Sequence, residues 1–303
     1  MKALLDGVVV AAYGKRYEVE ITDADAVKHR VSCVTRGKKT DLACGDFVQI
    51  KMTDSAKNTP EGVVEKSLPR KTLLYRSNAF KSKTLASNVT QIIIVLATQP
   101  SFYEALLNRC LIAAETAGIK ALIVLNKCDL ADSSDAISKI ALYKHMGYKI
   151  LALSAKEDIS PLKQHLLGHT SVLVGQSGMG KSTIVNALLP NEMVRTREVS
   201  DVLDSGKHTT TATHLYHLDA TSQLIDSPGL QEFGLHHLSI TDLEHAFIEF
   251  RPFLGKCRFN NCRHHHEPDC AIIEAVAAGK ITSTRLACYQ TLFIESTVKQ
   301  PYL

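Results

Sequence analysis

The order of the nucleotide-binding motifs is the feature that most constrains how this chain folds. Residues 172–183, VLVGQSGMGKST, match the phosphate-loop pattern GxxxxGK[ST], with an apolar strand-like run before the glycines and a helical run after them. Domains built on this loop ordinarily begin with it. Here NKCD at 126–129 and SAK at 154–156 come earlier, and DSPG at 226–229 follows. Cutting such a domain after DSPG and joining its former ends produces this order, and the same sheet can form because domain termini are often close together.

Short apolar runs alternate with helical segments in the middle of the chain. The runs are QIIIVLA (91–97), ALIVL (121–125), KILAL (149–153) and SVLV (171–174). Runs of this length, separated by segments such as residues 102–118, predict a mainly parallel sheet with helices on both faces. Ligands of such sheets bind at the carboxyl ends of the strands, where the motifs stand. We therefore predict a circularly permuted P-loop domain over residues 88–232.

The first part of the chain predicts a different architecture. Residues 7–67 contain five short β-rich runs and no helical stretch, with a hairpin signal at Gly14-Lys15. We predict a small barrel over residues 1–68. An OB-fold, a frequent binder of oligonucleotides, is the most typical solution, and an SH3-like or other barrel without a ligand is the alternative. Residues 69–87 are predicted to be a basic, weakly structured connector.

Residues 233–303 predict a third, mainly helical domain. Thr241-Asp-Leu-Glu244 is typical of a capping box that opens a helix, and Gly279 stands where a helix C-cap is expected. The whole chain is therefore predicted to be a multidomain α/β protein, with an N-terminal OB-fold barrel, a permuted P-loop domain and a C-terminal helical domain.

Three of the eight cysteines are clustered with histidines in the last domain. The set of candidate ligands is Cys257, Cys262, His264 and Cys270. Three thiolates and one imidazole are typical of a closed, tetrahedral structural zinc site. From the spacing alone, His265 and His266 compete with His264 for the imidazole position. A small helical domain has little core of its own, so a structural metal is physically reasonable.

Composition restricts the partners and the location. The region up to Lys83 carries 16 Lys and Arg against 10 Asp and Glu, although the net charge of the chain is only +4. This indicates a polyanionic partner, with a merely solvated face as the commoner alternative. The N-terminus is interrupted by Asp6 and does not fit a signal peptide. Because no apolar run approaches the roughly 20 residues that cross a bilayer, a cytosolic protein without membrane contact is expected.

The phosphate loop predicts a role for each of its residues. Backbone N–H groups and the helix N-terminus are expected to surround phosphate oxygens. Lys181 is expected to reach the β- and γ-phosphates, Ser182 to bind Mg²⁺, and Thr183 to contact the α-phosphate. The residues whose backbone would line the phosphates are Gly175, Gln176, Ser177, Gly178, Met179 and Gly180.

NKCD and SAK together predict a guanine pocket. The Asp129 carboxylate can accept hydrogen bonds from N1–H and the 2-amino group of guanine, whereas adenine would leave that carboxylate unpaired. Asn126 is expected to brace the pocket, and the stem of Lys127 to cover the base beside Cys128. In Ser154-Ala155-Lys156 a backbone N–H is expected to meet guanine O6.

The switch segments are less fully specified. Asp226 is expected to hold Mg²⁺ through water, and the Gly229 N–H to contact the γ-phosphate. The next residue is Leu230, where many GTPases carry a water-orienting Gln. In residues 206–211 we favour Thr210, among three consecutive threonines, as the Mg²⁺ ligand. His208 is a candidate for orienting the attacking water, and an ordinary loop histidine is the alternative.

The motifs together resemble one family. NKCD before GQSGMGKST, followed by GKHTTTAT, DSPGL and CRFNNCRHHHEPDC, resembles the small ribosomal subunit biogenesis GTPase family, known as RsgA or YjeQ, over essentially the whole chain. The resemblance implies an OB-fold, a permuted GTPase domain and a zinc-binding helical domain. It assigns zinc to Cys257, Cys262, His264 and Cys270, and it supports a hydrolytic role for His208. It implies binding to the 30S subunit late in maturation, contact with 16S rRNA, and hydrolysis of GTP to GDP and phosphate stimulated by that subunit.

Two other functions remain open from the sequence. One alternative is a non-enzymatic RNA-binding module in which GTP is only a conformational ligand. Leu230 is compatible with this alternative, because it cannot orient a water molecule as Gln does. An ATP-dependent factor would require NKCD to be accidental. We expect a monomer. Because DSPG leads directly into the helical domain, we also expect nucleotide state to move that domain relative to the barrel.

Overall fold

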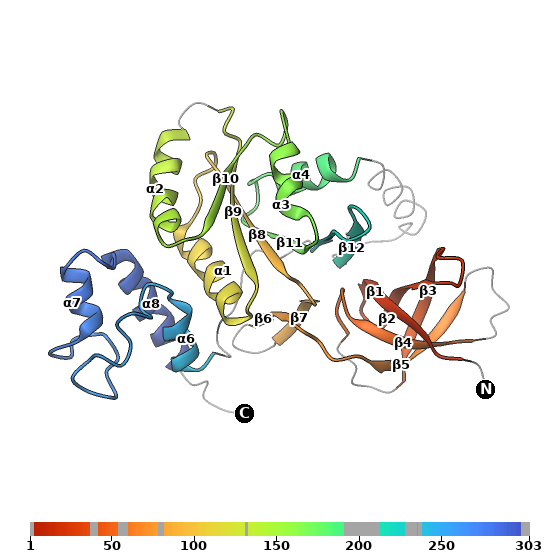
Figure 1. The fold of residues 1–303 in the computed structure, drawn as a ribbon, viewed down its shortest axis with the longest axis horizontal. Helices are drawn as coiled ribbons and strands as arrows, with labels where there is room; N and C mark the ends of the chain where they lie inside the picture. Colours follow the sequence, from red (N-terminus) through yellow and green to blue (C-terminus); the bar gives the residue numbers. More distant parts are fainter. Residues whose placement is uncertain are drawn as a thin grey trace.

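The structure is a computed structural model that describes most of the chain. The described residues are 3–36, 42–53, 60–77, 82–130, 133–190, 213–227, 235 and 238–297. They form an N-terminal barrel, a central α/β sheet and a group of C-terminal helices, with the sheet between the other two regions (Figure 1).

The N-terminal region is a closed five-stranded barrel, as the sequence predicts. Its strands are β1 (Leu5–Tyr13), β2 (Arg16–Thr22), β3 (Lys28–Thr35), β4 (Phe47–Met52) and β5 (Glu61–Ser67). The strand order is β1-β2-β3-β5-β4, and β4 pairs back onto β1 to close the barrel. Tyr13 pairs with Arg16 across the predicted hairpin turn, where Gly14 supplies the positive φ of +68° that a two-residue turn requires.

The connector after the barrel is more regular than the sequence suggests. Strands β6 (Leu73–Ser77) and β7 (Ser82–Ser87) form an antiparallel pair. The prediction of a weakly structured segment is therefore wrong. Leu74 and Leu85 are buried, and Ala86 makes an isolated bridge to Cys44 of the barrel. These buried positions hold the pair in place although basic residues surround them in the sequence.

The central sheet is mainly parallel. Its strands, in spatial order, are β10 (Lys149–Ala152), β9 (Lys120–Asn126), β8 (Gln91–Ala97), β11 (Thr170–Val174), β13 (Gln223–Asp226) and β12 (Thr213–His217). The first five are parallel to their neighbours, and β12 runs antiparallel to β13. The other edge of β12 pairs with barrel strand β1, so the barrel and the central domain share one continuous sheet.

Helices cover both faces of this sheet. They are α1 (Glu104–Thr116), α2 (Ser133–His145), α3 (Ser160–Leu166) and α4 (Lys181–Leu188). Alternate residues of β8 separate the two faces: Ile92 and Ile94 belong to the core with α1 and α2, whereas Ile93 and Val95 belong to the core with α3 and α4. All seven residues of β8 are buried, as expected of a central parallel strand.

The C-terminal region consists of α6 (Ile240–Ala246), α7 (Ala271–Ala277) and α8 (Ser283–Thr297) around an irregular cysteine-bearing loop. The predicted capping box at Thr241–Glu244 is wrong. Ser239 is the N-cap of α6, and its hydroxyl accepts from the Asp242 N–H. The Glu244 side chain therefore takes no part in capping α6. The C-cap expected at Gly279 is consistent with its φ of +70°, one residue beyond the cap of α7.

One hydrophobic core joins the C-terminal helices to the central domain. Leu107 and Leu111 of α1 lie in one buried cluster with Leu243 of α6 and Tyr289 of α8. Phe250, which lies in the segment after α6, belongs to the same cluster. The barrel has a further core of its own, with Val9, Val19 and Val31 among its members, while Val10 of β1 and Cys44 lie in the shared cluster. Domain boundaries therefore remain predictions, since the buried cluster crosses from one region to the next.

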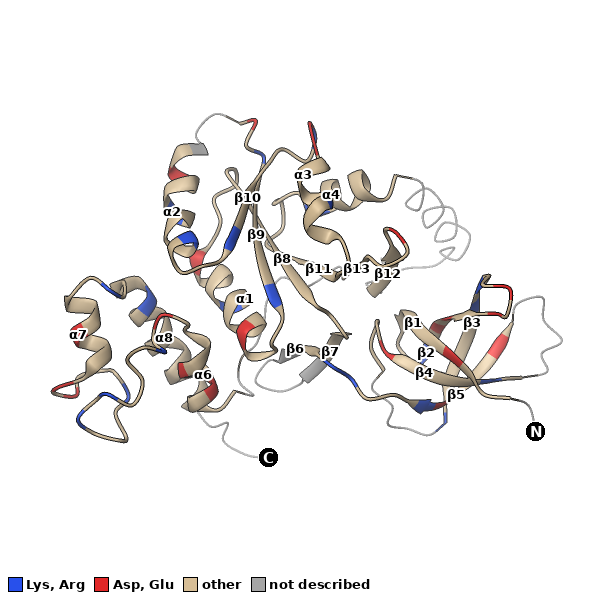
Figure 2. Cartoon of the chain, in the orientation of Figure 1, with Lys and Arg blue, Asp and Glu red and all other residues tan. Residues whose placement is uncertain are grey.

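The described barrel does not show a purely basic face. Along the ribbon of the barrel, lysine and arginine positions alternate with aspartate and glutamate positions (Figure 2). Several are paired within the molecule, including Arg70 with buried Asp46 and Arg36 with Glu65. Among the described residues, no helix is long and apolar enough to cross a membrane.

Candidate nucleotide site and metal centre

The predicted nucleotide motifs meet at one edge of the central sheet. NKCD begins at the last residue of β9, SAK follows β10, the phosphate loop follows β11, and DSPG begins at the end of β13. These strands are parallel, so their carboxyl ends lie at the same edge (Figure 1). The permuted chain order is therefore compatible with one contiguous site.

The phosphate loop requires its glycines. A Cβ on Gly175 would lie 2.3 Å from the Val95 carbonyl oxygen, and one on Gly180 would lie 2.3 Å from Nδ2 of Asn126. Gly180, at the N-cap of α4, has a φ of +92° that other residues rarely adopt. Only glycine at these positions lets the loop approach β8 and the NKCD segment so closely.

Lys181 and Asp226 form the electrostatic centre of the site. The Lys181 ammonium donates to the carbonyl oxygens of Gly175 and Gln176, at 2.6 and 2.7 Å. Burial lowers the pKa of Lys181, and the charge of Asp226 opposes that shift. Burial likewise raises the pKa of Asp226, and Lys181 opposes that shift in turn. The two groups thus favour each other's charged forms at the mouth of the loop.

Asn126 joins three of the motifs through one side chain. Its amide nitrogen donates to the Met179 carbonyl of the phosphate loop at 3.0 Å, and its amide oxygen accepts from the Ala155 N–H of SAK at 2.9 Å. The residue is 2% exposed. Because both ends of the amide are used, the relative positions of NKCD, SAK and the phosphate loop depend on this one group.

Asp129, the last residue of NKCD, presents an exposed carboxylate near Ser154 of SAK. The Ser154 side chain nearby lowers the pKa of this carboxylate, and the charges of Lys156 and Lys127 lower it further. Asp129 is therefore an anionic acceptor at neutral pH. Cys128 is placed beside it and is held through its own N–H, which donates to the Leu153 carbonyl.

Sequence reasoning missed the loop that follows β8. The Lys127 ammonium donates to the Gln99 carbonyl at 2.7 Å, and the Thr98 hydroxyl donates to the Lys127 carbonyl. The Tyr103 N–H donates to the side-chain oxygen of Gln176 in the phosphate loop. This loop thus braces both motifs. Its position after a central parallel strand was the available signal.

The remaining predicted residues divide into two groups. Ser182 and Thr183 lie in the first turn of α4, directly after Lys181. His208, Thr210 and Gly229 lie outside the described residues, as does Leu230. Next to Asp226, the Ser227 hydroxyl is 3.0 Å from the hydroxyl of Thr213, the first residue of β12. This contact ties the start of DSPG to the strand that follows the threonine segment.

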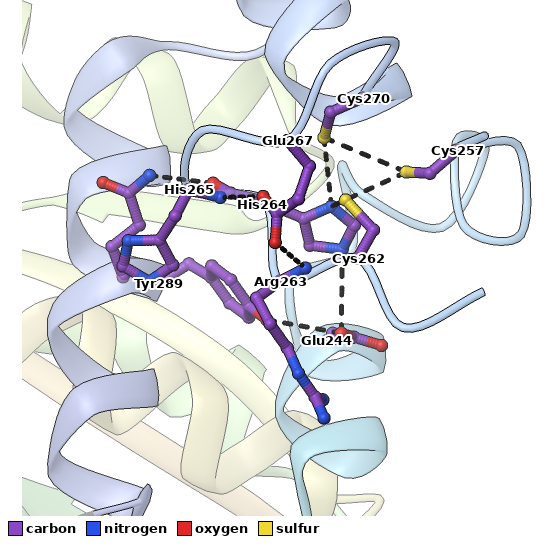
Figure 3. A network of polar contacts seen from close by, with 10 residues as sticks. Glu244, Cys257, Cys262, Arg263, His264, His265, Glu267, Cys270 and Tyr289 are labelled. Atoms are coloured by element: carbon purple, nitrogen blue, oxygen red, sulfur yellow. Dashed lines mark hydrogen bonds and ion pairs between the residues drawn. The ribbon is translucent and has the colours of Figure 1, made fainter. Parts of the chain in front are cut away.

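The four predicted metal ligands converge in the C-terminal region. One ligand atom each from Cys257, Cys262, His264 and Cys270 lies within 4.8 Å of all the others. Nδ1 of His264 is 3.7, 3.5 and 3.2 Å from the sulfur atoms of Cys257, Cys262 and Cys270 (Figure 3). Bonds of about 2.3 Å to sulfur and about 2.0 Å to nitrogen around one tetrahedral ion imply S···N separations of about 3.5 Å. The cluster therefore has the dimensions of a tetrahedral metal site.

The structure distinguishes the three adjacent histidines. His264 supplies its Nδ1 to the cluster, whereas the ring of His265 packs against Phe293 at 5.5 Å. The Glu267 carboxylate accepts from the backbone N–H groups of Arg263, His265 and His266, at 2.7, 2.8 and 3.1 Å. Although burial alone would raise the pKa of Glu267, these N–H groups lower it to about 2. The carboxylate thereby holds the loop in the shape that turns His264 inward.

Comparisons with known proteins agree with this geometry. A family model described as RsgA GTPase matches residues 67–236. The chain is 49% identical over 289 residues to the small ribosomal subunit biogenesis GTPase RsgA of Nitrosospira multiformis, covering 95% of this chain and 90% of the relative. It is also 49% identical to the protein of the same name from Ralstonia pickettii, covering 98% and 94%.

Solved structures show the same architecture. The crystal structure of YjeQ from Thermotoga maritima matches with a TM-score of 0.73 and 28% identity, covering 98% of this chain and all of the other. The structure of YloQ, described as a circularly permuted GTPase, matches with a TM-score of 0.71 and 26% identity, covering 99% and 98%. The predicted fold, with its barrel, permuted P-loop domain and C-terminal region bearing a Cys/His cluster, is confirmed.

Proposed function

The chain belongs to the RsgA family of ribosome biogenesis GTPases, and from that premise we propose that it binds the 30S ribosomal subunit late in maturation and hydrolyses GTP faster when bound there. It is a GTP hydrolase. The observation that carries the proposal is the Asn126 side chain, which joins the guanine-pocket motifs to the phosphate loop. That junction is what a GTP site needs, whatever the order of its parts along the chain.

We assign the nucleotide contacts by the motif that each residue occupies. Lys181 binds the β- and γ-phosphates, and the backbone of residues 175–180 surrounds their oxygens. Asp129 accepts hydrogen bonds from N1–H and the 2-amino group of guanine, and a backbone N–H of SAK donates to guanine O6. The anionic state of Asp129 and the buried position of Lys181 support these roles. Ser182 and Thr183 follow Lys181 in the first turn of α4. Asp226 ends β13, and its charge interacts with that of Lys181.

Magnesium belongs with the nucleotide in this proposal. Ser182, Asp226 and Thr210 would hold the ion, whose chemistry is to neutralise charge developing on the phosphates. His208 orients the attacking water, and the Gly229 N–H contacts the γ-phosphate. Since Leu230 has no hydrogen-bonding side chain, hydrolysis without a partner is expected to be slow. A slow basal rate is consistent with an enzyme that the subunit activates.

The metal centre is proposed to hold one structural Zn²⁺. Three sulfurs and one imidazole leave no position for a substrate, and their separations fit a tetrahedral ion. Its role is to order the loop between Cys257 and Cys270, which contains no helix or strand of its own. The barrel and the positive charges of this loop, such as Arg258 and Arg263, are the proposed contacts with 16S rRNA. We propose that the protein is a monomer. We also propose that it is cytoplasmic, because ribosomal subunits assemble in the cytoplasm.

The test is GTP turnover by the purified full-length protein with 30S subunits, with 50S subunits and alone. Stimulation by 30S subunits only would support both the activity and the partner. A rate unchanged by either subunit would contradict the proposed partner and favour a GTP-responsive binding module. Lys181→Ala serves as the nucleotide-binding control, because it is expected to abolish turnover in all three conditions. Asp129→Asn is expected to exchange GTP preference for xanthosine triphosphate, whose C2 carbonyl requires a donor.

A further inference from the structure

The metal cluster leaves one buried polar atom to be explained. His264 directs Nδ1 at the three sulfur atoms, so its other ring nitrogen, Nε2, faces away from the cluster (Figure 3). That atom is buried and has no hydrogen-bond partner among the described residues. The His264 side chain is only 4% exposed, so water is not expected to replace a protein partner.

The chemistry of a metal-bound imidazole defines what Nε2 needs. A neutral imidazole that offers the Nδ1 lone pair to a metal carries its proton on Nε2. That N–H is a donor, and leaving a buried donor unpaired is costly. Histidine ligands in metal sites almost always donate this second N–H to a carboxylate, a carbonyl or a water.

Glu244 is the acceptor that faces this atom. Its Oε1 lies 3.6 Å from Nε2 of His264, slightly beyond hydrogen-bond distance. The Tyr289 hydroxyl, from α8, is 3.3 Å from the same carboxylate oxygen. Tyr289 is fully buried, so it restricts where the carboxylate can go. The backbone carbonyl of His264 is already used by Gln290, which donates to it at 2.8 Å.

We propose that Glu244 is a positioning residue of the metal centre, which accepts the Nε2 proton of His264 and thereby holds Nδ1 toward the ion. This inference rests on the proposed zinc site and adds to it a residue outside the cysteine loop. Glu244 lies on α6, and α6 packs against α1 of the central domain. The hydrogen bond therefore fastens the metal loop to a helix that packs on the GTPase domain.

The assignment also explains why the capping box failed. A box residue at Glu244 would turn its carboxylate back toward the start of α6. Ser239 and Asp242 cap that helix without it. Glu244 lies one turn further along and points into the interior, where its side chain is 19% exposed. The acidic residue that the sequence suggested for helix capping is thus available to the metal centre.

The test compares zinc affinity in the full-length protein by chelator competition at one fixed pH. Glu244→Ala is expected to weaken zinc binding by about 10- to 100-fold. Glu244→Gln, which keeps the shape and a weaker acceptor, is expected to fall between Glu244→Ala and the unchanged protein. Glu274→Gln, which changes an exposed glutamate on α7, is the matched control. It is expected to stay within about twofold of the unchanged protein, since it leaves the acceptor in place.

A second measurement separates positioning from general support of the fold. Nitrogen-15 spectra of histidine-labelled, zinc-loaded protein should show one imidazole with a metal-bound Nδ1 and a slowly exchanging Nε2 proton. In Glu244→Gln that proton signal should shift, while the metal-bound Nδ1 signal remains. Equal zinc affinity and an unchanged Nε2 signal in both Glu244 variants would overturn the inference but leave the zinc site intact. Absence of stoichiometric zinc from the unchanged protein would overturn both.

Discussion

The central GTPase domain meets its two neighbours by different physical means. On the barrel side β1 pairs with β12 through Ala11 with His214 and Ala12 with Thr213, and among the described barrel residues Val10 and Cys44 are the buried members of the shared core. On the opposite side α1 and α2 share a buried core with the C-terminal helices. Strand pairing at a sheet edge can be broken locally, whereas a shared core cannot be separated without exposing apolar surface.

Buried polar groups add to the asymmetry. Arg285 of α8 is fully buried and donates to both oxygens of Glu249 and to Oδ1 of Asn108 on α1. On the barrel side, Glu20 accepts from His217 of β12 at 2.7 Å and pairs with Lys28 at 3.1 Å, and the Lys28 side chain is 49% exposed. The first network is inaccessible to water and the second is partly solvated. We therefore expect the C-terminal junction to be the rigid one.

The positions of the two junctions differ as well. β12 begins immediately after the threonine segment of the sequence and pairs with β13, which ends at Asp226. The barrel is therefore attached to the strand that separates the two switch motifs. The C-terminal helices contact α1, whose start is linked to the phosphate loop through Tyr103 and Gln176. The sequence led us to expect motion of the C-terminal domain, and the structure favours the barrel junction as the place where motion is less costly.

Removal of the proposed zinc should give the largest effect, because structural zinc contributes about 10–16 kcal/mol of apparent binding free energy in small domains. Chelation is expected to unfold the loop between Cys257 and Cys270 while α6 and α8 stay packed on α1 through the shared core. Hydrogen exchange should then rise in the loop and change little in α1, and GDP affinity should stay within about twofold. Exchange that rises equally throughout α6, α8 and α1 would show that the metal, rather than the core, holds the junction together.

Loss of Arg285 should come next. Arg285→Met leaves the Glu249 carboxylate buried beside apolar rings, and breaking such a pair costs about 3–5 kcal/mol of unfolding free energy. Denaturant unfolding followed at the C-terminal region measures this. Arg251→Ala removes an exposed ion pair with Glu115 across the same junction and should cost about 1 kcal/mol or less. Replacing Glu249 by Leu in the Arg285→Met background should recover part of the loss, because no unpaired charge remains. Equal effects of Arg285→Met and Arg251→Ala would contradict the rigid junction.

Asn108 should matter less than Arg285 but more than surface pairs. Its side-chain oxygen accepts from both Arg285 and the Tyr143 hydroxyl of α2. Asn108→Ala leaves two buried donors without this acceptor, which should cost about 1–3 kcal/mol. Tyr143→Phe removes only one of the donors and should cost less in the same unfolding assay. The opposite ranking would mean that the hydroxyl, and not the amide oxygen, organises the network.

The two junctions also separate what the sequence predicts from what it does not. Strands β8, β9, β10 and β11 and the motifs after them follow from short apolar runs that end in glycine or polar residues, a local signal. Asn108 and Arg285 are 177 residues apart in the sequence, and no local sequence pattern at either residue predicts their contact. The β1–β12 pairing likewise depends on which sheet edges are left open. The capping box failed for a local reason, because Ser239 offered a competing hydroxyl two residues earlier.

The barrel junction should show the smallest change in stability and the clearest change in dynamics. Glu20→Gln weakens the contacts to His217 and Lys28 but leaves the backbone pairing of β1 with β12. The expected loss is about 1 kcal/mol or less, since the cluster is partly solvated. Glu18→Gln is the matched control, because Glu18 lies on the same strand and its ion-pair partner, Arg30, also belongs to the barrel.

Hydrogen exchange in β12 tests this expectation and its link to the nucleotide. In Glu20→Gln, exchange of the β12 amides should rise by up to about fivefold, which corresponds to about 1 kcal/mol, while α1 and α8 stay unchanged. In the unchanged protein, exchange of β12 should differ between GDP and a GTP analogue, because β12 adjoins both switch motifs. If nucleotide instead altered exchange at α8 and not at β12, the moving junction would be the one with the buried arginine. The shared core would then have to rearrange when the nucleotide changes, and the pairing of β1 with β12 would stay the same in both nucleotide states.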